Sequence, residues 1–275
     1  MNPLTVITEL SREFGTPDFV KGGGGNTSVK DADTLWVKPS GTTLATLTPE
    51  KFVAMDRHKL ARLYNVAIPA DSHAREALVK DLMAAAVKPG STGRASVEAP
   101  LHDIMSGTFV VHTHCTLVNG MTCARQGASV CARLFPDALW IPYVDPGFTL
   151  CMDVRRRLRG QRLVILENHG LFVAGDTADE IRATYRRVIK ALRAEYAKAG
   201  IAMELKTVAP LTPEPVTPDH IVYGKKPKLG PEMAADSALI RQLADAFGGV
   251  QLLDERSRQF IENWEVEAYR QTQIS

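Results

Sequence analysis

The chain has 275 residues, of which 45% are hydrophobic and 23% are charged, and its formal net charge is +2. This composition is typical of a soluble globular protein, and the small charge gives no electrostatic reason to expect binding to nucleic acid or an anionic membrane. No apolar run approaches the ~20 residues of a membrane span and the N-terminus lacks a signal-peptide layout, so we expect a cytoplasmic protein.

The first elements are a helix and a glycine-rich turn. Apolar residues recur at helical spacing over 4–14, and Gly15 is a suitable C-cap. The turn Gly22–Gly25 then leads into a predicted hairpin (27–30 and 34–38), whereas a dinucleotide-binding fingerprint runs from a strand into a helix. We therefore reject the dinucleotide interpretation. The bare amides of the turn could instead surround an anion, and a simple flexible turn is the alternative.

A second turn of small residues, Lys38–Thr43, leaves the hairpin and brings a cation and hydroxyl groups. Two such turns bracketing one hairpin could close on one phosphate. Asp71 predicts the start of a helix that stops near residue 89. Ser96 is predicted to cap a helix that continues to Met105, so that Glu98 falls in its first turn. The helix dipole there favours an ionised carboxylate. A favourable interaction with the dipole, without a role in a functional site, is the alternative for Glu98.

The next predicted element is a buried strand over 108–111, which ends in His112 and His114. Residues i and i+2 of a strand point to the same side, so these two imidazoles face the same way. His169 follows another apolar run, Leu163–Leu166, at a turn. Three histidines near a carboxylate such as Glu98 are typical of an open catalytic metal site, with zinc the first choice. A structural histidine pair bonded to backbone carbonyls is the alternative.

The cysteines and His102 are expected to have packing roles rather than catalytic or ligand roles. The four cysteines form no Cys-x-x-Cys pair, so they are predicted to be reduced, buried thiols. Cys115 follows directly after the second histidine and could be a nucleophile, but a packing role is favoured. His102 is likewise expected to be a packed or surface histidine rather than a fourth ligand.

Beyond the histidine strand, we predict a helix over 116–126 closed by Gly127, and an aromatic loop over 140–148 that forms a wall of the site. Strands follow at 163–166 and 171–174, and Thr177 with Glu180 forms a capping box for a helix that ends near residue 200. Six prolines between residues 210 and 231 mark an extended connector, followed by two helices. We therefore divide the chain into a catalytic domain (1–208) and a Pro-rich connector with a C-terminal helical extension (209–275).

Five short motifs together resemble the class II aldolase/adducin family. They occur in the family's order, cover roughly residues 5–200, and are Gly25–Val29, Lys38–Gly41, Ser96–Glu98, His112–His114 and Asn168–Gly170. The glycine run and the segment Asn263–Arg270 look most like the aldolase half of bifunctional rhamnulose-1-phosphate aldolase/dehydrogenases. The dehydrogenase half of those enzymes has no counterpart in this sequence.

The resemblance implies an α/β fold of three layers, in which a central, mainly antiparallel sheet is flanked by helices. It also implies a homotetramer with active sites between subunits. His112, His114 and His169 would then bind Zn²⁺ (or Mn²⁺ or Co²⁺), and Glu98 would be the catalytic acid/base. The positions that match substrate- or phosphate-binding residues are Gly25, Asn26, Ser40, Gly41 and Ser96. Lys38 and Tyr269 are further candidates.

The same residues suit retro-aldol cleavage. That reaction needs an electrophile to stabilise an enediolate, which a metal supplies, and a group that moves protons. Epimerases that resemble these aldolases place Asp where Glu98 stands, which favours a lyase that cleaves a short sugar, as a ketose phosphate, to dihydroxyacetone phosphate and an aldehyde. Val97 occupies a position where such aldolases often have serine, which leaves the substrate open. The alternatives are a decarboxylase or epimerase acting on a sugar acid or sugar phosphate, and a non-enzymatic, adducin-like interaction module.

Overall fold

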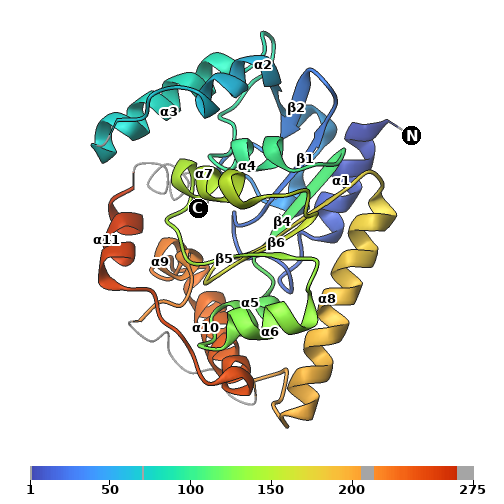
Figure 1. Cartoon of the computed structure of the whole chain (residues 1–275), viewed down its shortest axis with the longest axis vertical. Coiled ribbons are helices and arrows are strands. Elements are labelled where there is room, and N and C mark those ends of the chain that lie inside the picture. Colours follow the sequence, from blue (N-terminus) through green and yellow to red (C-terminus); the bar gives the residue numbers. More distant parts are fainter. Residues whose placement is uncertain (1, 70, 206–213, 265–275) are drawn as a thin grey trace.

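The computed structural model describes residues 2–69, 71–205 and 214–264, and these form a seven-stranded sheet with helices on both faces (Figure 1). The strand order is β3-β2-β1-β4-β7-β6-β5, which places β1, β4 and β7 in the middle. The strands are β1 (Asn26–Lys30), β2 (Thr34–Val37), β3 (Val53–Asp56), β4 (Phe109–Thr113), β5 (Leu139–Ile141), β6 (Leu163–Leu166) and β7 (Gly170–Gly175). The predicted hairpin near the N-terminus and the predicted pair after residue 162 are both confirmed.

The sheet is mixed, which corrects the expectation of a mainly antiparallel sheet. Strand β5 runs parallel to β6, whereas the other neighbouring strands are antiparallel. A parallel pair needs a crossover connection, and the chain crosses from β5 to β6 through helix α7 (Phe148–Arg157). The segment 140–148, predicted as an aromatic loop, therefore contains the end of β5 and the start of α7.

Side chains of the central strands alternate between two apolar layers. Val111 of β4 packs in a core with α1 (Pro3–Glu13) and α8 (Ala178–Lys198), whereas Val110 packs in a second core with α4 (Ala99–Ile104) and α7. His112 shares the parity of Val110, and its ring stacks on Phe172 of β7 at 3.8 Å between centroids. The rigid centre of the sheet thus fixes the direction of the first candidate ligand.

Most predicted helices begin where their capping residues stand. Asp71 accepts a hydrogen bond from Ala74 N at the start of α3, and Thr177 accepts one from Glu180 N at the start of α8.

The remaining helices of the described chain are α2 (Arg57–Leu60), α3 (Ser72–Ala86), α5 (Thr116–Thr122), α6 (Gly127–Leu134), α9 (Pro218–Tyr223), α10 (Gly230–Ala244) and α11 (Glu255–Asn263). Short 3₁₀ turns lie at Leu44–Thr46, Pro49–Lys51, Ala61–Tyr64 and Asp245–Phe247.

Two predicted helix boundaries are wrong. The helix predicted over 116–126 ends at Thr122 as α5, and Gly127, predicted to close it, instead begins the separate helix α6. A Cβ at Gly127 would lie 2.4 Å from Met121 O of α5. Helix α4 begins at Ala99, so its N-cap residue is Glu98 rather than Ser96, and no side chain caps it. The Ser96 hydroxyl accepts a hydrogen bond from the Glu98 N–H, 3.2 Å away, and the Glu98 carboxylate is used elsewhere.

The C-terminal segment packs against the rest of the described chain. The predicted extended connector contains helix α9, whose first residue is Pro218. Proline has no N–H, and an N–H at the first helical position would have no partner within the helix. Leu243 of α10 and Phe247 belong to the same core as α1 and α8. In the part of the chain that the structure describes, no helix is both long enough and apolar enough to cross a membrane.

Candidate metal centre

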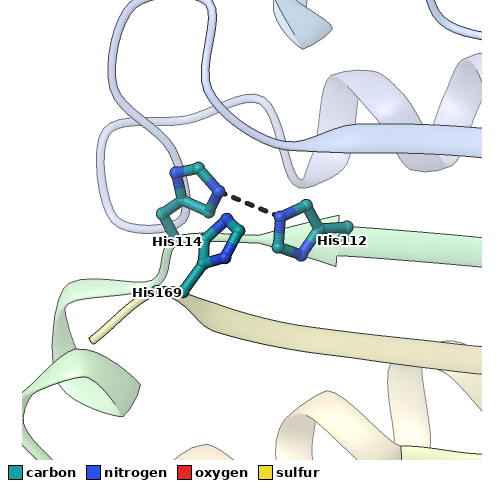
Figure 2. Close-up of side chains that lie close together, drawn as sticks. All are labelled: His112, His114 and His169. Carbon is teal, nitrogen blue, oxygen red and sulfur yellow. Dashed lines mark hydrogen bonds between the residues drawn. The ribbon is translucent and has the colours of Figure 1, made fainter. Parts of the chain in front are cut away.

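Strands β4 and β7 bring three histidines to one point. His112 lies in β4, and His114 follows directly after its end. His169 directly precedes β7, which pairs with β4 so that Thr113 lies opposite Leu171. Figure 2 shows the three rings pointing toward one another, and one ligand nitrogen from each ring lies within 4.8 Å of the others.

The hydrogen bonds of two of these rings direct their Nε2 lone pairs at a common point. His112 Nδ1 lies 2.9 Å from Leu171 O, and His114 Nδ1 lies 2.5 Å from Asp219 Oδ2. A carbonyl and an ionised carboxylate only accept, so each Nδ1 carries a proton, and in the neutral form of the ring that binds a metal this is its only proton. The two Nε2 atoms, 2.9 Å apart, then face each other as acceptors. A shared cation resolves that conflict, because two nitrogens on a tetrahedral zinc lie about 3.3 Å apart.

Burial sets the charge of the cluster. It lowers the pKa of His169 to about 3, and it also lowers the pKa of His112, so both rings are neutral near neutral pH. Neutral imidazole is the form that binds a metal. Burial alone would raise the pKa of the Glu98 carboxyl, but His112, followed by His169 and His114, holds that pKa well below its usual range. Glu98 is therefore ionised near neutral pH.

Glu98 faces the histidines from the start of α4. Its Oε1 lies 3.5 Å from Nε2 of His112 and 3.5 Å from Nε2 of His169. Its Oε2 accepts a hydrogen bond from Asn26 Nδ2 at 2.5 Å, which fixes the carboxylate from the β1 side. Among the described residues, Asn26 Oδ1 is a buried acceptor without a hydrogen-bond partner. An unused buried acceptor beside a carboxylate and three imidazoles fits a polar ligand at this point.

The loops that carry the predicted anion-binding residues are joined to one another. Lys38 Nζ donates to Gly23 O at 3.0 Å, which links the two small-residue turns. Ser40 N donates to Arg94 O at 2.8 Å, which links the second turn to the segment before Ser96. The hydrogen bonds thus join the three loops near the N-terminus of α4.

Three glycines of the two small-residue turns adopt left-handed backbone conformations, Gly22 with φ +50°, Gly25 with φ +70° and Gly41 with φ +80°. A Cβ at Gly25 would lie 2.8 Å from His112 O, so this position has no room for a side chain. The glycine run therefore enters β1 beside the histidines. It does not lead from a strand into a helix, as a dinucleotide-binding turn would.

Two other residues weighed from the sequence, His102 and Cys115, do not belong to the histidine cluster. Tyr269 lies outside the described residues. His102 is buried, with Nδ1 2.8 Å from Ser28 Oγ and its ring edge-on to Phe172, and it is not one of the three clustered histidines. Burial raises the pKa of the Cys115 thiol to about 11, as expected for a packed cysteine rather than a nucleophile.

Sequence analysis assigned no individual role to two residues around the histidines. Asp219, from α9, contacts His114, and nothing in the proline-rich connector indicated that role. Asn168 precedes His169 with a left-handed φ of +51°, and its Nδ2 donates to Val216 O and Gln251 O, both at 2.8 Å. Here a signal was present, because Asn tolerates the left-handed region and Asn-His-Gly follows a strand.

The family model for the class II aldolase and adducin N-terminal domain matches residues 5–196. This chain belongs to that family. Class II aldolases are metal-dependent, and the three histidines described above can hold a metal. The finer resemblance to the aldolase half of rhamnulose-1-phosphate aldolase/dehydrogenases stays a prediction.

Three individual proteins illustrate the similarity. An uncharacterised oxidoreductase of Bacillus subtilis (strain 168), YuxG, is 30% identical over 170 residues, which are 57% of this chain and 24% of YuxG. The match thus spans about a quarter of that relative's length. The N-terminal class II aldolase domain of a Thermoplasma acidophilum protein is 27% identical with a TM-score of 0.60, over 69% of this chain and 91% of that one. An L-fuculose 1-phosphate aldolase is 16% identical with a TM-score of 0.50, over 72% and 85%, and shows the shared fold.

Proposed function

We propose that this protein is a metal-dependent lyase that reversibly cleaves a short sugar, as a ketose phosphate, to dihydroxyacetone phosphate and an aldehyde. The observation that carries the proposal is the Glu98 carboxylate, 3.5 Å from Nε2 of both His112 and His169. A proton-transferring group beside a metal is the combination that retro-aldol cleavage requires. Family membership and the similarity to an L-fuculose 1-phosphate aldolase support the assignment.

In this proposal His112, His114 and His169 hold the metal, Zn²⁺ first, with Mn²⁺ and Co²⁺ as the other candidates. When bound, the metal supplies a Lewis acid for the negative charge that develops on the substrate oxygens. Glu98 removes a proton from carbon in the synthetic direction and returns it in the cleavage direction. Asn26 orients Glu98 through its Oε2. Burial of the cluster keeps water away from the carbanion-like species.

The substrate's anionic end is proposed to bind at the joined loops. The candidate residues are Gly25, Asn26, Ser40, Gly41 and Ser96, with Lys38 as a nearby cation. Backbone amides at glycine turns and a charged lysine both favour a phosphate. Inorganic phosphate should therefore compete with the ketose phosphate. No competition at tens of millimolar, about the weak end expected for a bare anion, would contradict a phosphate site.

A second candidate, a decarboxylase or epimerase of a sugar acid or sugar phosphate, is kept because of Val97. This residue lines a mostly apolar cavity of about 450 Å³ together with Val79, Phe148 and Trp264. A hydroxyl for phosphate is therefore missing where related aldolases often have one. Product analysis separates the candidates, because only cleavage yields dihydroxyacetone phosphate.

The decisive experiment incubates metal-loaded protein with dihydroxyacetone phosphate in D₂O, with and without a panel of aldehydes. We expect exchange of one carbon-bound hydrogen without aldehyde, because Glu98 acts before the aldehyde is needed. We also expect a ketose phosphate with at least one aldehyde. The His169→Ala variant serves as the control and should do neither. Absence of both exchange and product with the metal-loaded wild type would refute the aldolase assignment, and absence of any bound metal would favour an adducin-like interaction role.

We further propose a cytoplasmic homotetramer, as in the enzymes that the sequence resembles. Its substrates would be small sugars or sugar phosphates. Light scattering coupled to size-exclusion chromatography measures the oligomer directly, and a monomer that retains full activity would refute a shared active site.

A further inference from the structure

A carboxylate from the C-terminal segment contacts a candidate metal ligand. Asp219 lies in the first turn of α9 and is 4% exposed. Its Oδ2 is 2.5 Å from Nδ1 of His114, a residue 105 positions earlier in the chain. The family model ends at residue 196, so this contact comes from a part of the chain beyond the matched domain.

The contact determines which nitrogen of His114 can bind a metal. An ionised carboxylate accepts a hydrogen bond from Nδ1–H. A neutral ring has only one proton, so Nε2 then presents its lone pair. That nitrogen lies 2.9 Å from His112 Nε2, on the side of the ring that faces the cluster. A carboxylate partner also makes the ligating nitrogen more basic, and such partners typically change metal affinity about 10–100-fold.

The helix that carries Asp219 is itself held by buried polar contacts. The neighbouring His220 bonds through Nε2 to Asp236 Oδ2 of α10 at 3.1 Å. The other oxygen of Asp236 accepts from Thr116 Oγ1 of α5 at 2.5 Å and pairs with Lys21 Nζ at 3.3 Å. Helix α5 begins two residues after His114. Helix α9, which carries the Asp219 carboxylate, is therefore linked through Asp236 to α5, the helix that follows strand β4.

The glycine-rich turn provides an independent observation. A Cβ at Gly24 would lie 2.7 Å from Asp219 Oδ2 and 3.0 Å from His114 Nδ1. Position 24 therefore leaves room for the carboxylate to reach the ring. One glycine of the run that sequence analysis assigned to an anion is explained by a protein carboxylate instead.

We propose that Asp219 is a positioning residue of the metal centre, which fixes the tautomer and direction of His114 and thereby makes metal affinity depend on the C-terminal segment. The inference rests on the metal centre of the proposed function but not on the identity of the reaction. It adds a functional role to α9, a helix in the segment predicted to be a connector.

The test compares the Zn²⁺ affinity of wild type, Asp219→Ala and Asp219→Asn by competition with a chromophoric chelator. We expect Asp219→Ala to bind about 10–100-fold more weakly and to change the visible absorption of the Co²⁺-loaded protein. Asp219→Asn keeps the shape and an acceptor oxygen, so a smaller loss is expected from the missing charge alone. Circular dichroism establishes whether each variant is folded. If the Ala variant does not fold, the near-isosteric Asn variant still provides the test.

The matched control is Asp145→Asn, which removes the charge of another buried carboxylate, one that pairs with Arg256 of α11 in the C-terminal segment at 2.9 Å and not with a clustered histidine. It should retain wild-type affinity. Equal affinities for wild type and both Asp219 variants would overturn the proposal, and so would an equal loss in Asp145→Asn, because the effect would then come from loosened packing of the C-terminal segment. Failure of wild type to bind Zn²⁺ would instead refute the metal centre itself.

Discussion

At the residue scale, the proposed chemistry makes Glu98 the side chain most sensitive to a one-atom change. Glu98→Gln keeps an oxygen that can accept from Asn26 Nδ2, so the fold and the metal content should persist. Turnover should fall by about 10²–10⁴, the usual contribution of a general acid/base. Steady-state kinetics and elemental analysis measure the two effects separately.

The control for this change is Glu167→Gln. Glu167 lies two residues before His169, and its carboxylate bonds to Gln251 rather than to the histidines. It should keep turnover within a few-fold of wild type. A loss below about tenfold in Glu98→Gln would argue against proton transfer by Glu98.

A second residue-scale prediction concerns Lys30, whose ammonium donates to His102 O at 2.6 Å from a buried position in β1. Burial lowers the pKa of Lys30 to about 8 from 10.5. The folded state therefore disfavours the charged form. This penalty is fully present below pH 8, and it disappears as the pH rises toward 10.5, where the unfolded chain also loses the proton.

The free energy of unfolding of wild type should accordingly rise relative to that of Lys30→Met by about 3 kcal/mol between these pH values. Urea titrations of both proteins at several pH values measure the difference, and the ionisation of thiols and tyrosines cancels in it. A pH-independent difference would show that Lys30 titrates normally in the fold.

The sequence was sufficient for the three histidines but not for Asp219, and the reason is physical. The alternation of a strand places His112 and His114 together whatever the tertiary structure, and His169 lies in the turn that follows a recognisable buried strand. Asp219 reaches His114 only after α9 docks, and the proline spacing around it indicated an extended chain. A contact across 105 positions leaves no periodic signature.

At the scale of elements, the pairing of β4 with β7 sets the distance between the ligands. A Cβ at Gly170 would lie 2.2 Å from Thr113 O, across this pair. Gly170→Ala should therefore push β7 away from β4 and displace His169 from His112. We expect a loss of stability of about 1–3 kcal/mol, the usual range for overpacking, together with weaker Zn²⁺ binding.

Gly160→Ala is the matched control, because Gly160 has φ +91° but a Cβ added there would meet no atom within 4 Å. It should lose about 1–2 kcal/mol from the left-handed backbone alone and keep its Zn²⁺ affinity. If both variants bind Zn²⁺ equally well, the spacing of β4 and β7 does not control the centre.

The elements that sequence analysis missed share one property: tertiary contacts, not local pattern, define their limits. Strand β5 has three residues, too few for a periodic signal, and exists because it pairs with β6. The break between α5 and α6 follows from the close approach of Gly127 to Met121 O. Caps such as Thr177 act within a few residues of the helix start, and they were predicted correctly.

At the scale of the whole molecule, the shared core predicts that the domain and its C-terminal segment unfold together. Leu243 of α10 is fully buried, and a Cβ at Gly120 of α5 would lie 2.4 Å from its Cβ. Leu243→Ala should reduce the free energy of unfolding by about 2–5 kcal/mol and shift one single transition. Circular dichroism and tryptophan fluorescence during urea unfolding should give coincident curves.

Leu252→Ala provides the comparison, since Leu252 is 39% exposed and its truncation should change stability by less than about 0.5 kcal/mol. Two separate transitions in wild type, with only one of them moved by Leu243→Ala, would show that the C-terminal segment is an independent unit. That result would support a division near residue 208.

Positions 24 and 219 are expected to change together during evolution, because the backbone at Gly24 leaves no room for a Cβ beside the Asp219 carboxylate. A homologue that acquires alanine or a larger residue at position 24 should lack the carboxylate, and a homologue that loses α9 is released from the glycine. An alignment of this family should therefore show the two columns covarying. Grafting the glycine run into a relative without this helix would confer no advantage on its metal binding.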